Sequence, residues 1–312
     1  MPRVTTTLIA EDMVTAPKAL NSWVAWIPLF ILPAAVCVFR WRLQPWEFMW
    51  LLSITVFYGC KWQTWINARA ARRPASALRN IGYLLLWPGM DADTFLDCKN
   101  KLTKPTSVAW FSALAKTVAG IVLLVVAARS LGRVHPLVTG WAAMLGLILF
   151  LHFGSFHLVA LSWRSFGVNA SPIMRSPLRS NSLGEFWGKR WNLGFHELTR
   201  DLVFQPARKR LSATLATLAA FLASGLVHDF VISFPARGGY GLPTAYFLLQ
   251  GLGVLFERSP AGRRLGLREG TRGWLFALMV AGAPVFLLFH RAFVMTVIVP
   301  FVAAIRDALV RV

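Results

Sequence analysis

Residues 211–234 read LSATLATLAAFLASGLVHDFVISF and form a long, nearly charge-free run. Its only ionisable residues are His228 and Asp229. An apolar run of this length can cross the roughly 30 Å hydrocarbon core of a bilayer as a helix. Three basic residues, Arg208 to Arg210, stand immediately before it, as is typical of the cytoplasmic mouth of a span. The stretch therefore predicts a transmembrane helix that carries one histidine.

The rest of the chain has the composition of a membrane protein. Of its 312 residues, 56% are hydrophobic and 15% are charged, whereas soluble domains are about 45–50% apolar and about 25% charged. This composition excludes soluble globular folds. We predict an all-α, polytopic transmembrane protein with about 7–9 spans plus interfacial amphipathic helices. The whole chain, residues 1–312, is expected to form one integral-membrane domain.

The predicted spans follow from the apolar runs. They are residues 23–39, 46–66, 107–128, 137–161, 211–234, 242–256 and 274–290, with 293–305 as an eighth span or as a continuation broken at Pro300. Lys61 is expected to extend toward the membrane surface from the end of the second span. The run Ile81–Trp87 is too short to cross, so it is predicted to be interfacial or re-entrant. Asp91 or Asp93 is then placed to cap a short helix.

The net charge of +20 comes from 33 Lys and Arg against 13 Asp and Glu. Nucleic acid is excluded as a partner by the hydropathy, which leaves membrane lipid headgroups and anionic substrates. The N-terminal segment and the loops between the first seven spans place 23 basic residues on one side and 5 on the other. This asymmetry predicts that the basic segment 162–210 is cytoplasmic. The expected location is a bacterial cytoplasmic membrane.

Segment 182–202 has the pattern of an amphipathic helix. Ser182 and Glu185 have the spacing of a capping box. An apolar stripe then follows steps of three and four and comprises Trp187, Trp191, Phe195, Leu198 and Leu202. A second face carries Glu185, Lys189, Asn192, His196 and Arg200. This pattern predicts a helix lying in the membrane interface with its aromatic side chains toward the lipid.

His228 is the candidate catalytic residue because an ionisable side chain within a span is costly to bury. A neutral histidine in a dry pocket is a plausible general base, contributing roughly 10²–10⁴-fold. Ser224 lies one turn earlier on the same face and is placed to orient the ring, whereas Asp229 is rotated about 100° away. Small residues near it, Ala220, Ala223 and Gly225 among them, permit close approach of another helix or of an acyl chain. The alternative is a structural histidine bonded to a neighbouring helix.

Asn192 is the second candidate because an amide can donate a hydrogen bond to a developing oxyanion, an effect near 10²–10³-fold. The alternative is ordinary polar surface, and the same applies to His196. The histidines at positions 152, 157 and 290 lack metal-ligand spacing with carboxylates and are interpreted as mostly structural. No metal site is predicted. Paired carboxylates for glycoside hydrolysis, a Gly-x-Ser-x-Gly motif and a phosphate-binding glycine loop are all lacking.

Several of these stretches resemble one known family. Phe186-Trp-Gly-Lys-Arg-Trp-Asn192, Phe204-Gln-Pro206 and Ser224-Gly-Leu-Val-His-Asp229 resemble the membrane-bound O-acyltransferases, and within them the wax synthase branch related to sterol and diacylglycerol acyltransferases. Trp87-Pro-Gly-Met-Asp91 and the tail from Pro284 through His290 to Pro300 are also similar. The likeness covers roughly residues 83–301, after the N-terminal spans at 23–66. One departure is Asp229, where the family frequently has Glu.

The resemblance implies an acyl-CoA-dependent O-acyltransferase of lipid metabolism that esterifies a lipophilic alcohol. It implies that His228 is the catalytic base and that Asn192 lies on the acyl-donor side. The substrate-binding residues expected around them are Trp187, Lys189, Arg190, Trp191, His196 and Ser224. Acyl-CoA is then a co-substrate, and no cofactor is expected.

Two alternatives stay open from the sequence. One keeps the acyl transfer but has a sterol, a diacylglycerol or a hydroxylated metabolite as the acceptor. The other is a carrier or flippase for an anionic lipid, with His228 as a proton relay. Broken spans in paired halves would favour the carrier, and the sequence has none that repeat. Its oligomeric state does not follow from these patterns.

Overall fold

The computed structural model describes residues 22–71, 75–97 and 104–311, and within these the chain is helical with no β-strand. The all-α fold predicted from composition is confirmed. The α-helices are α1 Ser22–Val38, α2 Pro45–Ala71, α3 Ala77–Leu86, α4 Ala92–Leu96, α5 Ser107–Ser130, α6 Pro136–Ile148, α7 Phe156–Ser165, α8 Leu183–Glu185, α9 Leu193–Thr199, α10 Gln205–Arg208, α11 Ala213–His228, α12 Phe234–Ala236, α13 Leu242–Arg258, α14 Pro260–Arg264, α15 Gly270–Gly282, α16 Val285–Leu288, α17 Arg291–Phe293 and α18 Val299–Val310.

Short helical segments of other types connect some of these helices. Two are 3-10 helices, η1 Arg40–Arg42 and η3 Pro177–Arg179. Five are π-helical, η2 Leu149–Ser155, η4 Phe186–Arg190, η5 Arg200–Phe204, η6 Asp229–Ser233 and η7 Val294–Ile298. Such wide turns inside helices occur frequently at functional sites. One of them, η6, begins directly after His228.

Five helical runs in the described part of the chain are long and apolar enough to cross a bilayer. They are Ser107–Ser130, Pro136–Ser165, Ala213–Ala236, Gly270–Leu288 and Arg291–Val310. These match five of the predicted spans, and the last one continues through Pro300 because that proline stands at the start of α18. α1 is a shorter apolar helix, and the crossing of α1, α2 and α13 stays a prediction. Large apolar side chains are exposed on the outer faces, such as Phe111 and Val126 on α5, as lipid contact requires.

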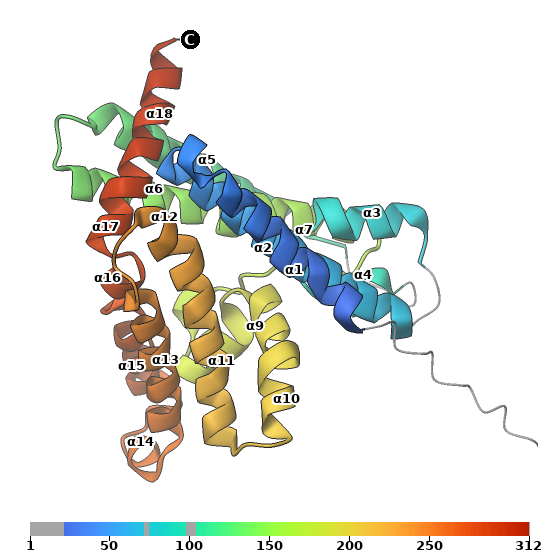
Figure 1. Cartoon of the computed structure of the whole chain (residues 1–312). Coiled ribbons are helices and arrows are strands. Elements are labelled where there is room, and N and C mark those ends of the chain that lie inside the picture. Colours follow the sequence, from blue (N-terminus) through green and yellow to red (C-terminus); the bar gives the residue numbers. More distant parts are fainter. Residues whose placement is uncertain (1–21, 72–74, 98–103, 312) are drawn as a thin grey trace, which may run out of the picture.

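The helices form two connected parts (Figure 1). The long helices α1 and α2 pack side by side and run obliquely across the molecule, with α3 and α4 near their far end. Beside them, α11 packs against α13, and α15 lies next to α13. The largest buried cluster joins the two parts; it includes Met49 of α2, Met144 of α6, Phe247 of α13 and Val302 of α18. The core therefore holds α11 and α13 in a fixed place.

Lys61 does not extend to the membrane surface, so that expectation was wrong. Its side chain is 0% exposed, its Nζ donates to the Gly89 carbonyl, and this nitrogen lies 3.4 Å from the centre of the Tyr83 ring. The Tyr83 hydroxyl in turn donates to the Met90 carbonyl at 2.9 Å. A buried polar group costs less free energy where it is hydrogen-bonded in this way. The loop that holds Gly89 and Met90 is thus attached to α2 and α3.

The short apolar run forms α3, and the turn after it behaves as predicted. The Asp91 carboxylate accepts a hydrogen bond from the Thr94 backbone at 2.9 Å and caps α4. In α3, Tyr83 is buried while Leu85 and Leu86 are exposed, which suits a helix at the membrane surface. Residues 72–74 and 98–103 of the predicted basic loop lie outside the described part of the chain.

Candidate active site

His228 is the last residue of α11, and its ring is held on two sides. Nδ1 lies 2.7 Å from the Ser224 carbonyl oxygen. A carbonyl only accepts hydrogen bonds, so Nδ1 carries the proton and donates it. The Phe247 ring of α13 lies 4.4 Å from the imidazole, centre to centre. Nε2 is therefore left with a lone pair and has no hydrogen-bond partner among the described residues, which is the state that a base requires.

Ser224 orients the ring as predicted, but through its backbone. Its hydroxyl donates to the Ala220 carbonyl at 3.0 Å and so stays within its own helix. The predicted close approach of helices is found one residue later. A Cβ on Gly225 would come within 2.7 Å of the Thr244 Cα. The lack of a side chain there lets α13 approach α11 closely enough for Phe247 to reach the histidine.

Phe247 also contacts the surface segment, because the Trp187 ring lies 5.6 Å from it. The Trp187 indole donates to the Gln250 side-chain oxygen at 3.3 Å, and the Gln250 amide donates to the Val280 carbonyl of α15 at 2.8 Å. Gln250 is 0% exposed. Buried polar groups are stabilising when both ends are bonded. α13 thus provides one ring, that of Phe247, which contacts both Trp187 and His228.

The surface segment begins as predicted. The Ser182 hydroxyl accepts from the Glu185 backbone at 3.0 Å, and the Glu185 carboxylate accepts from Asn181 at 2.7 Å. Glu257 of α13 adds a second cap, since its carboxylate accepts from the Leu183 backbone at 2.6 Å and from Gly184 at 3.2 Å. Both caps satisfy N–H groups that the first turn leaves free.

The continuous interfacial helix over 182–202 was wrong. The chain leaves the helix at Trp191 and turns at Asn192, whose φ is +41°, before α9 begins. An extended stretch beside the turn competes with the helix: the Arg175 backbone donates to Arg190, and the Leu193 backbone donates to Ile173, at 2.8 and 2.9 Å. Asparagine is among the residues that tolerate this left-handed backbone best.

The break separates the predicted apolar stripe into two groups. Trp187 packs toward α11 and α13, whereas Phe195, Leu198 and Leu202 pack with Val56 of α2 and the Met90 loop. The Asn192 turn is close to that loop as well, since a Cβ on Gly194 would lie 3.2 Å from the Met90 nitrogen. The aromatic side chains are therefore packed inside the protein and do not form one lipid-facing stripe.

Asn192 and His228 are connected through aromatic rings and do not contact each other directly. Trp191, beside Asn192, stacks on Phe186 at 5.4 Å, and Phe186 contacts Trp187 at 5.1 Å. Trp187 then reaches His228 through Phe247. The Asn192 side chain is half-buried and makes no hydrogen bond with the residues that the structure describes, so its amide is free for a ligand.

Of the remaining predicted site residues, Arg190 is engaged within the protein. It pairs with Glu185 at 2.7 Å and donates to the Arg175 carbonyl at 3.3 Å. Lys189 is exposed and makes no ion pair within the described ranges. The His196 ring lies beside Gly188, and burial, helped by nearby Arg200, lowers the pKa of His196. His196 is therefore a neutral group at the same turn.

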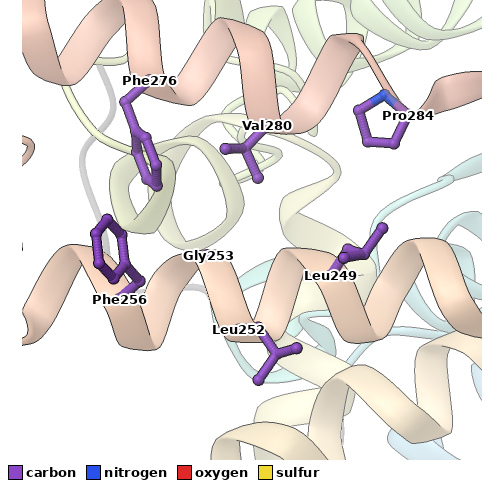
Figure 2. A pocket seen from close by; sticks show the side chains of 7 residues that line it. All are labelled: Leu249, Leu252, Gly253, Phe256, Phe276, Val280 and Pro284. Carbon is purple, nitrogen blue, oxygen red and sulfur yellow. The ribbon is translucent and has the colours of Figure 1, made fainter.

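An apolar groove of about 400 Å³ lies between α13 and α15 (Figure 2). Across it, Phe276 of α15 faces Phe256 of α13, and Val280 of α15 faces Gly253 of α13. Successive residues of a helix are rotated by about 100°, which places the groove-lining side of α13 opposite Phe247. The groove is thus separate from the His228 site. Metal ligation is not indicated at either place: no cluster of three or more His, Cys, Asp or Glu occurs among the described residues.

One segment of the chain matches a known protein family. Residues 170–249, which include both Asn192 and His228, match the Membrane bound O-acyl transferase family. The predicted resemblance to that family is confirmed. A probable long-chain-alcohol O-fatty-acyltransferase 3 of Arabidopsis thaliana is 32% identical over 143 residues, which are 38% of this chain and 42% of that protein.

Two further relatives match parts of this chain. The long-chain-alcohol O-fatty-acyltransferase of Simmondsia chinensis is 31% identical over 136 residues, 39% of this chain and 38% of that protein. The acyl-CoA–sterol O-acyltransferase 1 of Arabidopsis thaliana is 30% identical over 73 residues, 21% of each chain. The chain thus spans about two-fifths of the length of these two long-chain-alcohol relatives.

Sequence reasoning missed Phe247, Gln250 and Glu257. Gln250 had a signal, as a polar residue in the middle of an apolar run. Phe247 had no such signal, because the sequence does not indicate which residues one aromatic side chain in an apolar run will contact. Glu257 directly follows the same run, and its role as a cap could be interpreted only once the position of α8 was known.

Proposed function

We propose that this chain transfers a fatty acyl group from acyl-CoA to a lipophilic alcohol, as a membrane-bound O-acyltransferase. The observation that carries the proposal is the state of His228. Its Nδ1–H is bonded to the Ser224 carbonyl, its Nε2 has no hydrogen-bond partner among the described residues, and it lies in a candidate membrane span within the segment that matches the family. The names of the relatives support an alcohol as the acceptor.

In the proposed reaction, Nε2 of His228 takes the proton of the alcohol hydroxyl. The alcohol oxygen forms a bond to the thioester carbonyl carbon, and the carbonyl oxygen gains negative charge. When the tetrahedral intermediate collapses, the C–S bond breaks, and the CoA thiolate takes the proton from the imidazolium. The products are an ester and CoA with a free thiol, so the base returns to its starting state.

Asn192 is proposed to donate from its amide to the carbonyl oxygen as that oxygen gains charge. Because Asn192 and His228 do not touch, the substrates would lie between the two, beside the rings of Trp187 and Phe247. Trp191, His196 and Lys189 would contact the donor at the surface. Arg190 would act through its Glu185 pair by shaping the 185–190 stretch. The small-residue face near Ala220 would admit the acyl chain.

We further propose that the basic loops lie in the cytoplasm of a bacterial cell, on the side where acyl-CoA is dissolved. The 23-to-5 division of basic residues supports this orientation. The basic surface would attract the phosphates of CoA as well as anionic lipid headgroups.

The test is incubation of the purified protein with labelled acyl-CoA and separate alcohols. Long-chain alcohols, a sterol and a diacylglycerol form the acceptor arms, and ester formation is the readout. We expect ester with a long-chain alcohol, and a loss of at least about a hundredfold in His228→Ala. Thr217→Val, in which a buried hydroxyl that bonds only its own helix is removed, is the matched control. Equal ester formation by the wild type and His228→Ala would sink the proposal.

A further inference from the structure

Asp229, the residue after His228, holds the start of α13. Its carboxylate accepts from the Gly241 backbone at 2.8 Å, from the Thr244 backbone at 3.0 Å and from the Thr244 hydroxyl. The Gly241 and Thr244 N–H groups belong to the first turn of α13 and have no partner within that helix. A carboxylate at this end is also favoured by the helix dipole. Asp229 thus caps α13 from a different helix.

A buried histidine and serine hold Asp229 in turn. His290 is 4% exposed, and its Nδ1 accepts from the Phe293 backbone at 3.2 Å. Nε2 must therefore carry the proton, and it donates to the Ser233 oxygen at 3.2 Å. The Ser233 hydroxyl has one hydrogen, which goes to the Asp229 carboxylate at 2.8 Å in preference to the Gly239 carbonyl at 3.3 Å. The bonds run in one direction, from His290 through Ser233 to Asp229.

This series of hydrogen bonds ends at η6, which directly follows His228, and at α13, which carries Phe247 against the His228 imidazole. Asp229 follows His228 at the start of the π-helical segment η6. Thr244, which Asp229 binds, stands three residues before Phe247, whose ring lies 4.4 Å from that imidazole. A shift at Asp229 would therefore move the ring of His228 and its neighbour together. A misplacement of about 1 Å far from the chemistry can cost on the order of a hundredfold in rate.

We propose that His290 and Ser233 are positioning residues for acyl transfer, acting through Asp229 and α13 on the His228 ring. This inference rests on the proposed function. It gives His290 a role beyond packing, and it explains the arrangement of a buried donor, a serine and a carboxylate next to the proposed base. Substrate contact is not part of this role.

The first experiment compares His290→Leu, His290→Gln and Ser233→Ala. The side-chain amide of glutamine can replace the Nε2–H donor, whereas leucine cannot. We expect kcat to fall at least about tenfold in His290→Leu and Ser233→Ala, with the KM for acyl-CoA within about twofold of wild type. His290→Gln should recover kcat to within about threefold of wild type. The double variant His290→Leu, Ser233→Ala should lose no more kcat than the more impaired of its two single variants, because both residues act through one chain of hydrogen bonds.

A matched pair tests the Asp229 end of the chain. Thr244→Val removes the hydroxyl that binds Asp229, and Thr217→Val removes a buried hydroxyl that binds only the Ala213 carbonyl. We expect Thr244→Val to lower kcat and Thr217→Val to leave it unchanged. Each rate is divided by the concentration of folded protein, which is checked by thermal unfolding and gel filtration. Unchanged kcat in Ser233→Ala, or multiplied losses in the double variant, would overturn the proposal.

A readout without catalysis separates this proposal from the proposed function. Diethylpyrocarbonate modifies histidine rings, and peptide mass spectrometry reports each site. The ratio of modification at His228 to that at exposed His135 should change at least about threefold in Ser233→Ala and His290→Leu, because the ring is no longer held in place. If the wild type forms no ester, the proposed function fails, and an unchanged ratio would still overturn the positioning role.

Discussion

At the scale of single residues, hydrogen bonds decide which groups are free to react. His228 uses Nδ1 to hold its ring and keeps Nε2 free, and Asn192 keeps its amide free while its backbone makes the turn. Arg190, by contrast, is bound to Glu185 and to a backbone carbonyl. The availability of a polar group therefore separates candidate reacting residues from those that shape the site.

Lys189 and Arg190 are expected to respond differently to substitution. If Lys189 contacts a CoA phosphate, Lys189→Gln removes a charge-assisted bond of about 1.5–3 kcal/mol, which raises the KM for acyl-CoA about tenfold or more. The kcat should stay nearly the same, as expected for lost uniform binding. Steady-state kinetics in detergent without anionic lipid measures both. A donor KM that does not move would assign Lys189 to lipid anchoring instead, and Arg190→Ala should mainly lower thermal stability.

Glu197 of α9 predicts a pH dependence of stability. Burial, with the nearby Asp91 carboxylate, raises the pKa of Glu197 to about 7. The folded chain then keeps a proton that the unfolded chain releases near its ordinary pKa of 4.5. Stability is therefore expected to fall as pH rises between these two values and to stay level above about 7.

Glu197→Gln removes that carboxylate, so the variant should lose less stability between pH 5 and pH 8 than the wild type. After allowance for solvent screening, the difference is about 1–2 kcal/mol. Thermal unfolding at a series of pH values measures it, with Glu269→Gln at an exposed position as the control. The same slope in Glu197→Gln and wild type would contradict this assignment.

At the scale of elements, α13 is the helix on which the site depends. It contacts His228 through Phe247, Trp187 through Gln250 and the start of α8 through Glu257. Its own position depends on the close contact with α11 at Gly225 and on the cap from Asp229. A change at either place should therefore reach all three contacts.

Gly225→Ala tests the packing of these two helices. The new Cβ would lie 2.7 Å from the Thr244 Cα, and a backbone atom cannot move aside as the end of a flexible side chain can. We expect a loss of about 1–3 kcal/mol in stability and a lower kcat. Gly282→Ala is the control, because a Cβ at that helical position meets nothing within 4 Å, and alanine there should be neutral or stabilising by up to about 1 kcal/mol. Equal behaviour of the two variants would contradict the close contact.

At the scale of the whole molecule, apolar side chains cover the outer faces of the spans, and hydrogen-bonded polar groups lie in the core. The outer faces of the spans are apolar and exposed, and the packed interior contains the polar bonds of Lys61, Gln250 and His290. In a bilayer, polar groups must be satisfied within the protein. The fold therefore gathers its polar groups where helices meet, and the candidate site lies at one such junction.

The orientation of the molecule is testable with two cysteines. In a background without the native cysteines, Ser171→Cys should be labelled from the cytoplasmic side and Tyr240→Cys from the opposite side. Both positions are exposed, and the span Ala213–Ala236 lies between them. The prediction rests on the division of basic residues. Labelling of both by an impermeant maleimide from a single side would show that this span does not cross.

The sequence by itself determined features that depend on near neighbours along the chain. Apolar runs predicted the long spans, Ser182 and Asp91 were recognised as caps, and the lone histidine of its span was recognised as the candidate base. Each of these follows from hydropathy or from a side chain bonding to a backbone a few residues away. Such features depend on residues close together in the sequence, so they can be predicted from the sequence.

Features that depend on residues far apart in the chain became visible in the folded structure alone. The helix predicted over 182–202 breaks because residues 173–175 bind its backbone at Asn192, and Lys61 stays inside because the Gly89 carbonyl and the Tyr83 ring surround it. The link between Ser233 and His290 joins residues 57 positions apart. The periodicity of a short segment does not indicate such contacts. Where tertiary contacts are strong, they override the local preference for a helix.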